Sequence, residues 1–163
     1  DEDKRKRARH EIYDAVKELV LAGKTAAFIT IGDPALYSTF SYIAQLAQRD
    51  GIETRAVSGI SSVTACANSL GISLGDEGEQ VHIIPDTGDI EEALKLPGTK
   101  VIMKCGRDVK RVKELLGKRE GISVYGVSDC GTAEERLYIG TEALPDEGIY
   151  MLTVFVKDEQ KEQ

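Results

Sequence analysis

The chain has 163 residues, of which 41% are hydrophobic and 30% charged, a composition typical of a globular protein with a sizeable core. Its formal net charge of −7 argues against a general nucleic-acid binder, because such proteins need a positive field to neutralise phosphates. Its apolar runs are far shorter than the ~20 residues that a membrane-spanning helix needs, and no secretory signal peptide is visible.

The few cysteines and histidines limit the chemistry that we expect. Cys66, Cys105 and Cys130 are widely separated and form no CxxC motif, and only two histidines are present. We therefore expect no metal centre and no cysteine nucleophile paired with a histidine. A reducing cytoplasm is the simplest location for these thiols.

The opening residues carry the only concentrated positive charge. They begin at Asp1, inside a charged helical pattern, which suggests that the sequence is part of something longer. We favour a solvated helix face for this basic cluster, with a role near an anionic substrate as the alternative. The cluster comprises Lys4, Arg5, Lys6, Arg7 and Arg9.

Helical and extended patterns alternate through the first half of the chain. Apolar residues recur at helical spacing in the opening segment, and Gly23 fits the C-terminal cap of that helix. The alternation favours a doubly wound, largely parallel sheet, because parallel neighbours need crossover helices. We expect helices at residues 3–21, 36–50 and 62–70, and strands at residues 25–30, 52–57 and 81–84.

A run of turn residues, Pro85-Asp86-Thr87-Gly88-Asp89, predicts a domain boundary. We assign residues 1–85 to a first α/β domain and residues 86–163 to a second. No helix separates the last two strands, so we expect a mixed sheet with an antiparallel edge there, and a frayed tail at residues 158–163. The expected elements are helices at residues 89–94 and 109–116, and strands at residues 100–103, 123–127, 137–139 and 150–157.

The strongest candidate site is the loop that follows the strand predicted at residues 25–30. It reads Ile31-Gly32-Asp33-Pro34-Ala35-Leu36-Tyr37-Ser38, and ligands of open α/β sheets bind beyond the carboxyl ends of the strands. Gly32 lets a ligand approach the backbone closely, whereas Asp33 and Pro34 would also make a good helix start with nothing bound. Local physics leaves both interpretations open.

A second loop, Val57-Ser58-Gly59-Ile60-Ser61-Ser62, has the same design of strand, glycine turn and helix start. Its backbone NH groups and the helix dipole suit a carboxylate or a ribose hydroxyl. Taken alone, Ser61 or Ser62 is more simply a helix cap. Two such loops after neighbouring strands favour a shared pocket more than either loop alone.

Two further candidates lie in the second half. Met103 ends a predicted strand, where it would pack on an adenine ring or a thioether, although a core methionine is commoner. Cys130 lies in the loop Ser128-Asp129-Cys130-Gly131-Thr132 after another strand. No histidine is near Cys130 in sequence, so it is a weak candidate for a nucleophile.

Taken in order, these segments resemble the tetrapyrrole methylase family. The similarity rests on GDPALYSTFSY (residues 32–42), SGISS (58–62), LGI (70–72), IMK (102–104) and GTAEER (131–136). Within the family, the GDPxLYST form is most similar to C20-methyltransferases of cobalamin biosynthesis, which act on precorrin-2 or cobalt-factor II.

The resemblance implies two α/β domains, a homodimer, a tetrapyrrole substrate and S-adenosylmethionine as methyl donor, folded in the cleft between the domains. It implies direct displacement of the sulfonium methyl by C20, and we name no catalytic base. By the same resemblance, the cofactor contacts are Ile31, Gly32, Asp33, Leu36, Ser61 and Ser62 from the first domain, and Met103 and Cys130 from the second.

Two features depart from the family pattern. Members usually begin with a strand and a GxGPGD loop that lines the substrate trough, and nothing like it precedes Lys24. We therefore expect the first strand, loop and helices to be absent, which would weaken binding or abolish activity. The second departure is Ser58-Gly59, where the family favours Pro-Gly.

Two alternative functions stay open. One is a different activity of the same fold, on another tetrapyrrole carbon, on diphthine intermediates or on ribosomal RNA. The other is a catalytically silent fragment or partner module.

Overall fold

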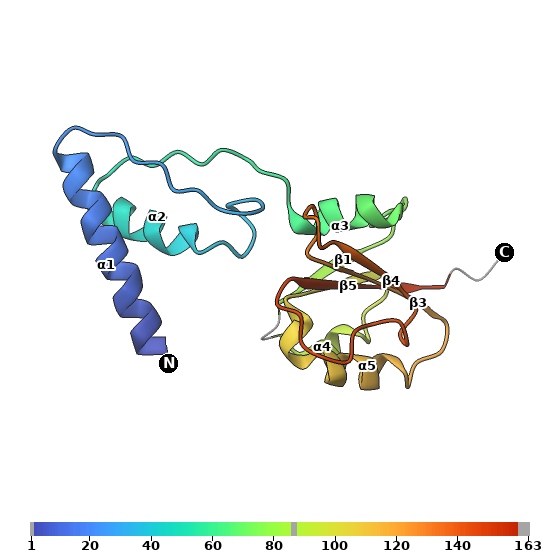
Figure 1. Cartoon of the computed structure of the whole chain (residues 1–163). Coiled ribbons are helices and arrows are strands. Elements are labelled where there is room, and N and C mark those ends of the chain that lie inside the picture. The colour runs from blue at the N-terminus through green and yellow to red at the C-terminus, as the bar shows by residue number, and fades with distance from the viewer. Residues whose placement is uncertain (1, 86–87, 160–163) are drawn as a thin grey trace. The chain divides into compact units, whose positions relative to one another are not determined.

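The computed structural model describes residues 2–85 and 88–159 (Figure 1). The chain divides into two compact units, Asp1–Ser61 and Ser62–Gln163, here called unit 1 and unit 2. The two units divide after Ser61, whereas the expected domains divide after residue 85, and the domain assignment stays a prediction. Part of the predicted boundary, Asp86-Thr87, lies outside the described residues.

Unit 1 is held together by two helices, α1 (Glu2–Leu21) and α2 (Phe40–Arg49). Tyr13 of α1 is buried against Ile43 and Ala47 of α2. Its hydroxyl donates to Asp50 Oδ2 at 2.6 Å, and the Lys17 ammonium donates to the same oxygen at 2.7 Å. Burial, and then the bond to Asp50, raises the pKa of Tyr13 to about 12. This polar contact therefore links the two helices beside a small apolar core.

Glycines end three helices of the chain in the same way. Gly23, Gly51 and Gly71 have φ values of 77°, 70° and 67°, a left-handed conformation that side chains disfavour. Behind α1, for instance, the NH of Gly23 donates to the Val20 carbonyl and the next NH donates to that of Leu19. These bonds provide donors for carbonyl groups that have no partner within the helix. The cap predicted at Gly23 is confirmed.

The two strands predicted in unit 1 are wrong. Residues 25–30 and 52–57 form no ladder, and within residues 2–85 the only strand is β1 (Val81–Ile84), which belongs to unit 2. Several of their apolar side chains are exposed, including Ile29 at 91% and Val57 at 77%. A short apolar run has the side chains typical of a buried strand. A strand also needs a neighbouring strand to hydrogen-bond with, and the run itself does not show whether one is present.

Unit 2 is an α/β unit built around one five-stranded sheet. Its elements lie close to the expected ranges, so the predicted α/β class is confirmed. They are α3 (Ser62–Leu70), β1 (Val81–Ile84), α4 (Ile90–Ala93), β2 (Thr99–Met103), the 3-10 helix η1 (Cys105–Asp108), α5 (Val109–Leu116), β3 (Ile122–Ser128), β4 (Arg136–Ile139) and β5 (Leu152–Asp158).

The sheet has the order β1-β2-β5-β3-β4. β1 is parallel to β2, whereas β5 is antiparallel to both β2 and β3, and β4 forms an antiparallel edge on β3. The predicted mixed sheet is therefore confirmed. Because β2 and β3 both run opposite to β5, their carboxyl ends lie at the same edge of the sheet.

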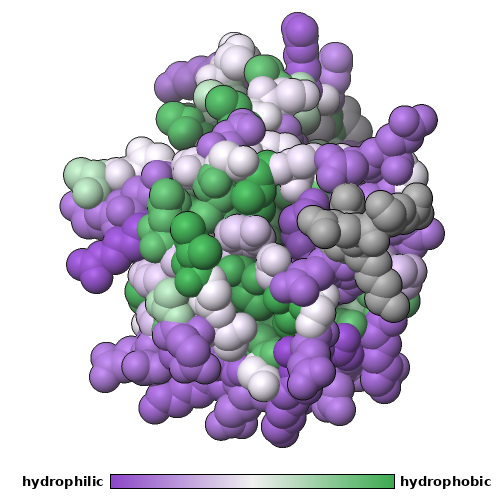
Figure 2. Space-filling model, turned by 90° about the vertical axis from the view of Figure 1, so that its right-hand side faces the viewer, coloured by the Kyte–Doolittle hydropathy of each residue, from purple (hydrophilic) through white to green (hydrophobic). Residues whose placement is uncertain are grey.

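Helices cover both faces of this sheet, with α3 on one side and α4 and α5 on the other (Figure 1). Ile102, Val154 and Val156 are fully buried in the core between the sheet and α5. Hydrophobic residues also reach the surface, as Figure 2 shows for one face of the molecule.

Charged side chains stabilise the sheet at the amino-terminal end of β2. Lys100 is only 1% exposed, and its ammonium donates to Asp158 Oδ1 at 2.6 Å and to the Leu96 carbonyl. Glu79 accepts from the Thr99 hydroxyl at 2.7 Å and pairs with Lys157. The hydrogen bond from Thr99 contributes most to lowering the pKa of Glu79.

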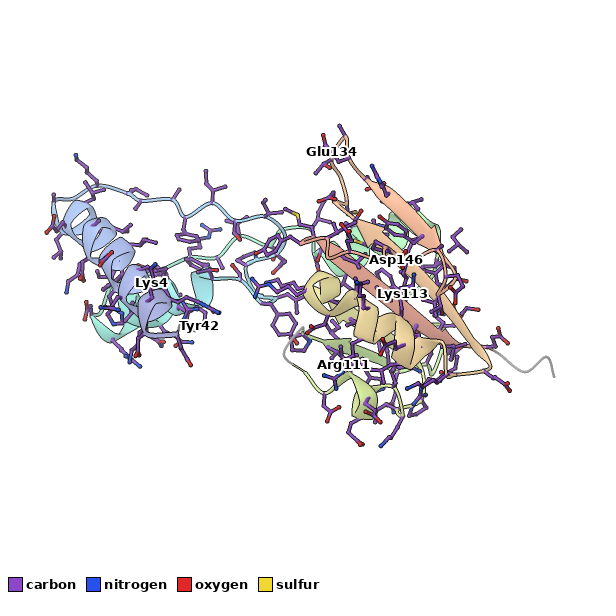
Figure 3. All side chains as sticks on the ribbon, turned by 60° about the horizontal axis from the view of Figure 1, so that its bottom comes forward. Lys4, Tyr42, Arg111, Lys113, Glu134 and Asp146 are labelled. Atoms are coloured by element: carbon purple, nitrogen blue, oxygen red, sulfur yellow. The ribbon has the colours of Figure 1, made fainter. Side chains whose placement is uncertain are left out.

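Lys113 and Asp146 add a further ion pair, on the side of α5. The Lys113 ammonium lies 2.7 Å from Asp146 Oδ1, and both side chains are labelled in Figure 3. The same ammonium also donates to the Leu144 carbonyl at 2.9 Å. This pair therefore ties α5 to the loop that precedes β5.

Candidate functional site

The two glycine loops of unit 1 meet at Asp33. Its Oδ2 accepts from the Gly59 NH at 2.9 Å, and its Oδ1 accepts from the Ala35 NH at 2.8 Å. A Cβ at Gly59 would lie 2.3 Å from the Gly32 carbonyl oxygen, far inside contact distance. The loops therefore approach each other backbone to backbone, and only glycine at position 59 permits it.

The structure contradicts one of the two interpretations left open for Asp33, namely that it caps the predicted helix. The predicted helix at residues 36–50 begins only at Phe40, and Thr39 stands at its N-cap position. Tyr37 has a φ of 50°, outside the helical region, so the turn at Asp33 cannot continue into α2. The carboxylate of Asp33 instead closes a local turn and holds the second loop.

Gly32 and Pro34 border a hollow of about 670 Å³ within unit 1, together with Gly59. Its walls are largely the two extended segments that form no ladder, with the aromatic ring of Phe40 nearby. Gly32 has a φ of 87°, which explains why glycine occupies this turn. Ile31 points away from the protein and is 88% exposed, whereas Leu36 is half-buried.

Unit 2 places the two remaining candidates at one sheet edge. Met103 ends β2 and pairs across the ladder with Thr153, which pairs in turn with Val127 of β3. Cys130 lies just after β3, so both candidates follow strands whose carboxyl ends lie together. Met103 is only 6% exposed, as a core methionine would be, whereas Cys130 is half-buried.

The loop that carries Cys130, residues 129–135, is closed by its own hydrogen bonds. Glu135 accepts from the Gly131 NH at 2.6 Å and from the Ser69 hydroxyl of α3 at 3.3 Å. The Gly131 NH, and then the Cys130 thiol, lowers the pKa of Glu135. Asp129 has a φ of 49°, a left-handed turn that starts the loop. The loop therefore has a defined shape anchored on α3.

The candidates thus fall into two sets. Gly32 and Asp33 meet the second loop in unit 1, and Met103 and Cys130 share a sheet edge in unit 2. Ser61 and Ser62 stand at the junction of the units, and Ser62 is the first residue of α3. As ligand contacts, all eight residues remain predictions.

Sequence reasoning missed three polar residues around these loops. Thr153 is the one polar residue inside an otherwise apolar stretch of β5 and is 6% exposed, a signal that could have identified it. Glu135 lies in the GTAEER segment that carries the resemblance, but the sequence gives no role to it or to Ser69, because only the fold brings α3 beside the loop at residues 129–135.

The basic cluster lies on α1, where its side chains are mostly exposed. Arg9 is the half-buried member, and its guanidinium lies 3.6 Å from the centre of the Tyr42 ring of α2. Such a cation–π contact stabilises the helix pair modestly. The other members of the cluster are exposed on α1, as expected for a solvated helix face.

Two features are absent from the described part of the chain. No three His, Cys, Asp or Glu side chains in residues 2–85 and 88–159 are grouped so that they could hold a metal ion. Over the same residues, no helix has both the length and the apolar character required to cross a bilayer.

Comparison with known proteins gives consistent matches. The family model described as Tetrapyrrole (Corrin/Porphyrin) Methylases matches residues 1–145. A curated "Probable cobalt-precorrin-2 C(20)-methyltransferase" of Methanocaldococcus jannaschii is 33% identical over 127 residues, which cover 78% of this chain and 55% of that protein. A "Precorrin-2 C(20)-methyltransferase" of Sinorhizobium sp is 26% identical over 148 residues, covering 88% and 60%.

The fold has solved counterparts as well. A cobalt precorrin-4 methyltransferase superposes with a TM-score of 0.77 at 20% identity, covering 91% of this chain and 70% of that one. At this identity the likeness shows a shared fold. The chain spans little more than half the length of the curated relatives that it matches.

Proposed function

Because this chain belongs to the tetrapyrrole (corrin/porphyrin) methylase family, we propose that the protein is an S-adenosylmethionine-dependent methyltransferase acting on C20 of precorrin-2 or its cobalt-containing counterpart. The names of the two curated relatives support this ring position. The chain covers 55% and 60% of those relatives, so the proposal concerns the whole protein.

The contact between Asp33 and Gly59 is the observation that carries the proposal. A methyl donor with an adenosine and an amino-acid carboxylate is bound well by backbone groups that are exposed on tight turns. In unit 1 such turns are pressed together, with a carboxylate bonded to both loops. This arrangement suits a ligand that is bound by backbone groups rather than by long side chains.

The residues present fit this donor. The backbone of Ile31 and Gly32 and the side chain of Leu36 would contact it, with the hydroxyls of Ser61 and Ser62 beside them. Two lone pairs of the Asp33 carboxylate already accept NH groups, so its main role would be to position the loops. Met103 and Cys130 of unit 2 are the remaining proposed contacts of the donor, following the resemblance given above.

The bound donor supplies an activated methyl group for direct displacement by C20. The chain's task is then to orient the two reactants in line and to exclude water. Rigid turns serve this task well, because a displacement of about 1 Å can cost a large factor in rate. The hydrogen bonds that the Gly59 and Ala35 NH groups donate to Asp33 would supply that rigidity.

The direct test is the reaction itself. Purified full-length protein is incubated with S-adenosylmethionine and either metal-free or cobalt-loaded precorrin-2. We expect one added methyl group, located at C20 by NMR, and the faster substrate identifies the natural one. Methylation of another ring carbon would contradict the proposed position. No methylation of either substrate, despite binding of S-adenosylhomocysteine, would contradict the proposed substrate class.

The proposal includes a cytoplasmic homodimer, following the resemblance given above. Light scattering coupled to size-exclusion chromatography measures the oligomeric state directly. A mass of two chains is expected, and a monomeric mass at micromolar concentration would contradict this part without affecting the proposed reaction.

A further inference from the structure

Two of the three cysteines lie together in unit 2. Cys66 is in the middle of α3 and 2% exposed, and Ser69, one turn further along α3, lies with its hydroxyl oxygen 3.7 Å from the sulfur of Cys130 in the loop at residues 129–135. Burial, and then the neighbouring Cys130, raises the pKa of Cys66 to about 12. Cys105 is buried elsewhere and donates to the Leu152 carbonyl at 3.7 Å. The fold therefore brings together two thiols that are distant in sequence.

We propose that Cys66 and Cys130 form a reversible intramolecular disulfide that ties α3 to the loop at residues 129–135 when the protein meets a peroxide. This modification goes beyond the proposed function and does not depend on it. In a reducing compartment such a bond is transient and responds to oxidant.

Exposure decides the order of events. Cys130 is half-buried whereas Cys66 is buried, so the thiolate of Cys130 meets hydrogen peroxide first. Its sulfur attacks one peroxide oxygen, the O–O bond breaks, and a sulfenic acid and water form. The sulfur of Cys66 then attacks that of Cys130, and hydroxide leaves with the Cys66 proton as a second water. Two thiols lose two electrons, and one peroxide is reduced.

Glu135 should slow this reaction. Its carboxylate accepts a hydrogen bond from the Cys130 thiol and its charge also faces Cys66. This negative charge raises the pKa of Cys66 and so disfavours its thiolate, the form that attacks in the second step. Oxidation is therefore expected only at raised peroxide, and removal of this charge should accelerate it.

Thiol counting tests the bridge. The folded protein is treated with hydrogen peroxide, unfolded, alkylated and analysed by peptide mass spectrometry. We expect wild type and Cys105→Ser to lose the same two thiols and to yield a peptide that joins residues 66 and 130. Cys130→Ser should yield no bridge, and dithiothreitol should restore all thiols. A wild-type protein that keeps three thiols, or that bridges Cys105, would overturn the proposal.

A rate comparison provides a second test that does not require a cysteine variant to fold. Glu135→Gln keeps an acceptor oxygen for Gly131 and Ser69 but removes the charge. Glu134→Gln is the matched control, since this neighbour is exposed, as Figure 3 shows. We expect several-fold faster bridge formation in Glu135→Gln than in Glu134→Gln. Equal rates would contradict an attacking thiolate beside Glu135.

Discussion

Unit 1 and unit 2 are held together in different ways. Unit 2 has a hydrogen-bonded sheet covered by helices on both faces, and Ile102 and other core residues are fully buried. Unit 1 has one helix pair around Tyr13 and two extended segments without a ladder. Its loops are held chiefly by the hydrogen bonds of Asp33. Thus unit 2 should dominate stability, whereas unit 1 carries the geometry on which ligand binding depends.

The largest effect should come from the sheet core. Ile102→Ala removes a fully buried side chain from unit 2 and should cost about 2–5 kcal/mol of unfolding free energy. Ile43→Ala is the matched change in unit 1, where the smaller core should make the loss clearly smaller. Urea unfolding measures both. Equal losses would contradict the difference between the units.

Removing Asp158 should have the next largest effect. Asp158→Ala leaves the buried ammonium of Lys100 without its carboxylate, and we expect a loss of about 2 kcal/mol. Fully buried pairs lose more, but Asp158 is 45% exposed at its side chain, so water moderates the cost. The double variant Lys100→Met with Asp158→Ala should recover most of this loss. A double variant as unstable as Asp158→Ala would show that the loss of stability does not come from the unpaired Lys100 ammonium.

Acid should weaken unit 2 through Glu79. The Thr99 hydroxyl, an NH and Lys157 lower the pKa of this carboxyl in the folded state. Its contribution to stability is therefore present above the unfolded value of about 4.3 and is lost as pH falls through the lower folded value. Glu79→Gln should flatten the loss of stability over that range, whereas Glu77→Gln at an exposed neighbour should not. Identical acid profiles for the two variants would refute the assignment.

The smallest stability effect is expected at Asp33. Asp33→Ala removes two acceptors for backbone NH groups at a half-exposed site, so folding should lose only about 1 kcal/mol. Binding of S-adenosylhomocysteine should fall by a larger free energy, because the loops lose their link. Calorimetry on the folded fraction separates the two effects. Unchanged affinity in that fraction would mean that Asp33 serves the fold alone.

The same contrast explains what sequence reasoning achieved. Helix ends are local events: Gly23 adopts the left-handed turn predicted for it, and Gly51 and Gly71 adopt the same conformation after the next two helices. The predicted ranges match β3, β4 and β5 to within two residues. The insertion of β5 between β2 and β3 depends on distant pairing, which no local pattern encodes.

For the site, the sequence identified the loops but not their contact. Glycine at position 59 signals a tight turn, yet the need for it comes from the Gly32 carbonyl on another loop. The same holds for Cys66 and Cys130, which have no signal in sequence, whereas the fold places α3 against the loop that carries Cys130. Residue types can be read from a single segment, whereas distances between segments require the structure.

The most direct measurement is calorimetric titration of S-adenosylhomocysteine into the full-length protein and two variants. Gly59→Ala places a methyl group against the Gly32 carbonyl and should separate the two loops. Ser58→Ala, one position earlier, is the control. We expect wild type and Ser58→Ala to bind with micromolar affinity, and Gly59→Ala to bind at least about tenfold more weakly while retaining its circular dichroism spectrum. A Gly59→Ala variant that binds as tightly as wild type, or a wild-type protein that does not bind, would contradict the account.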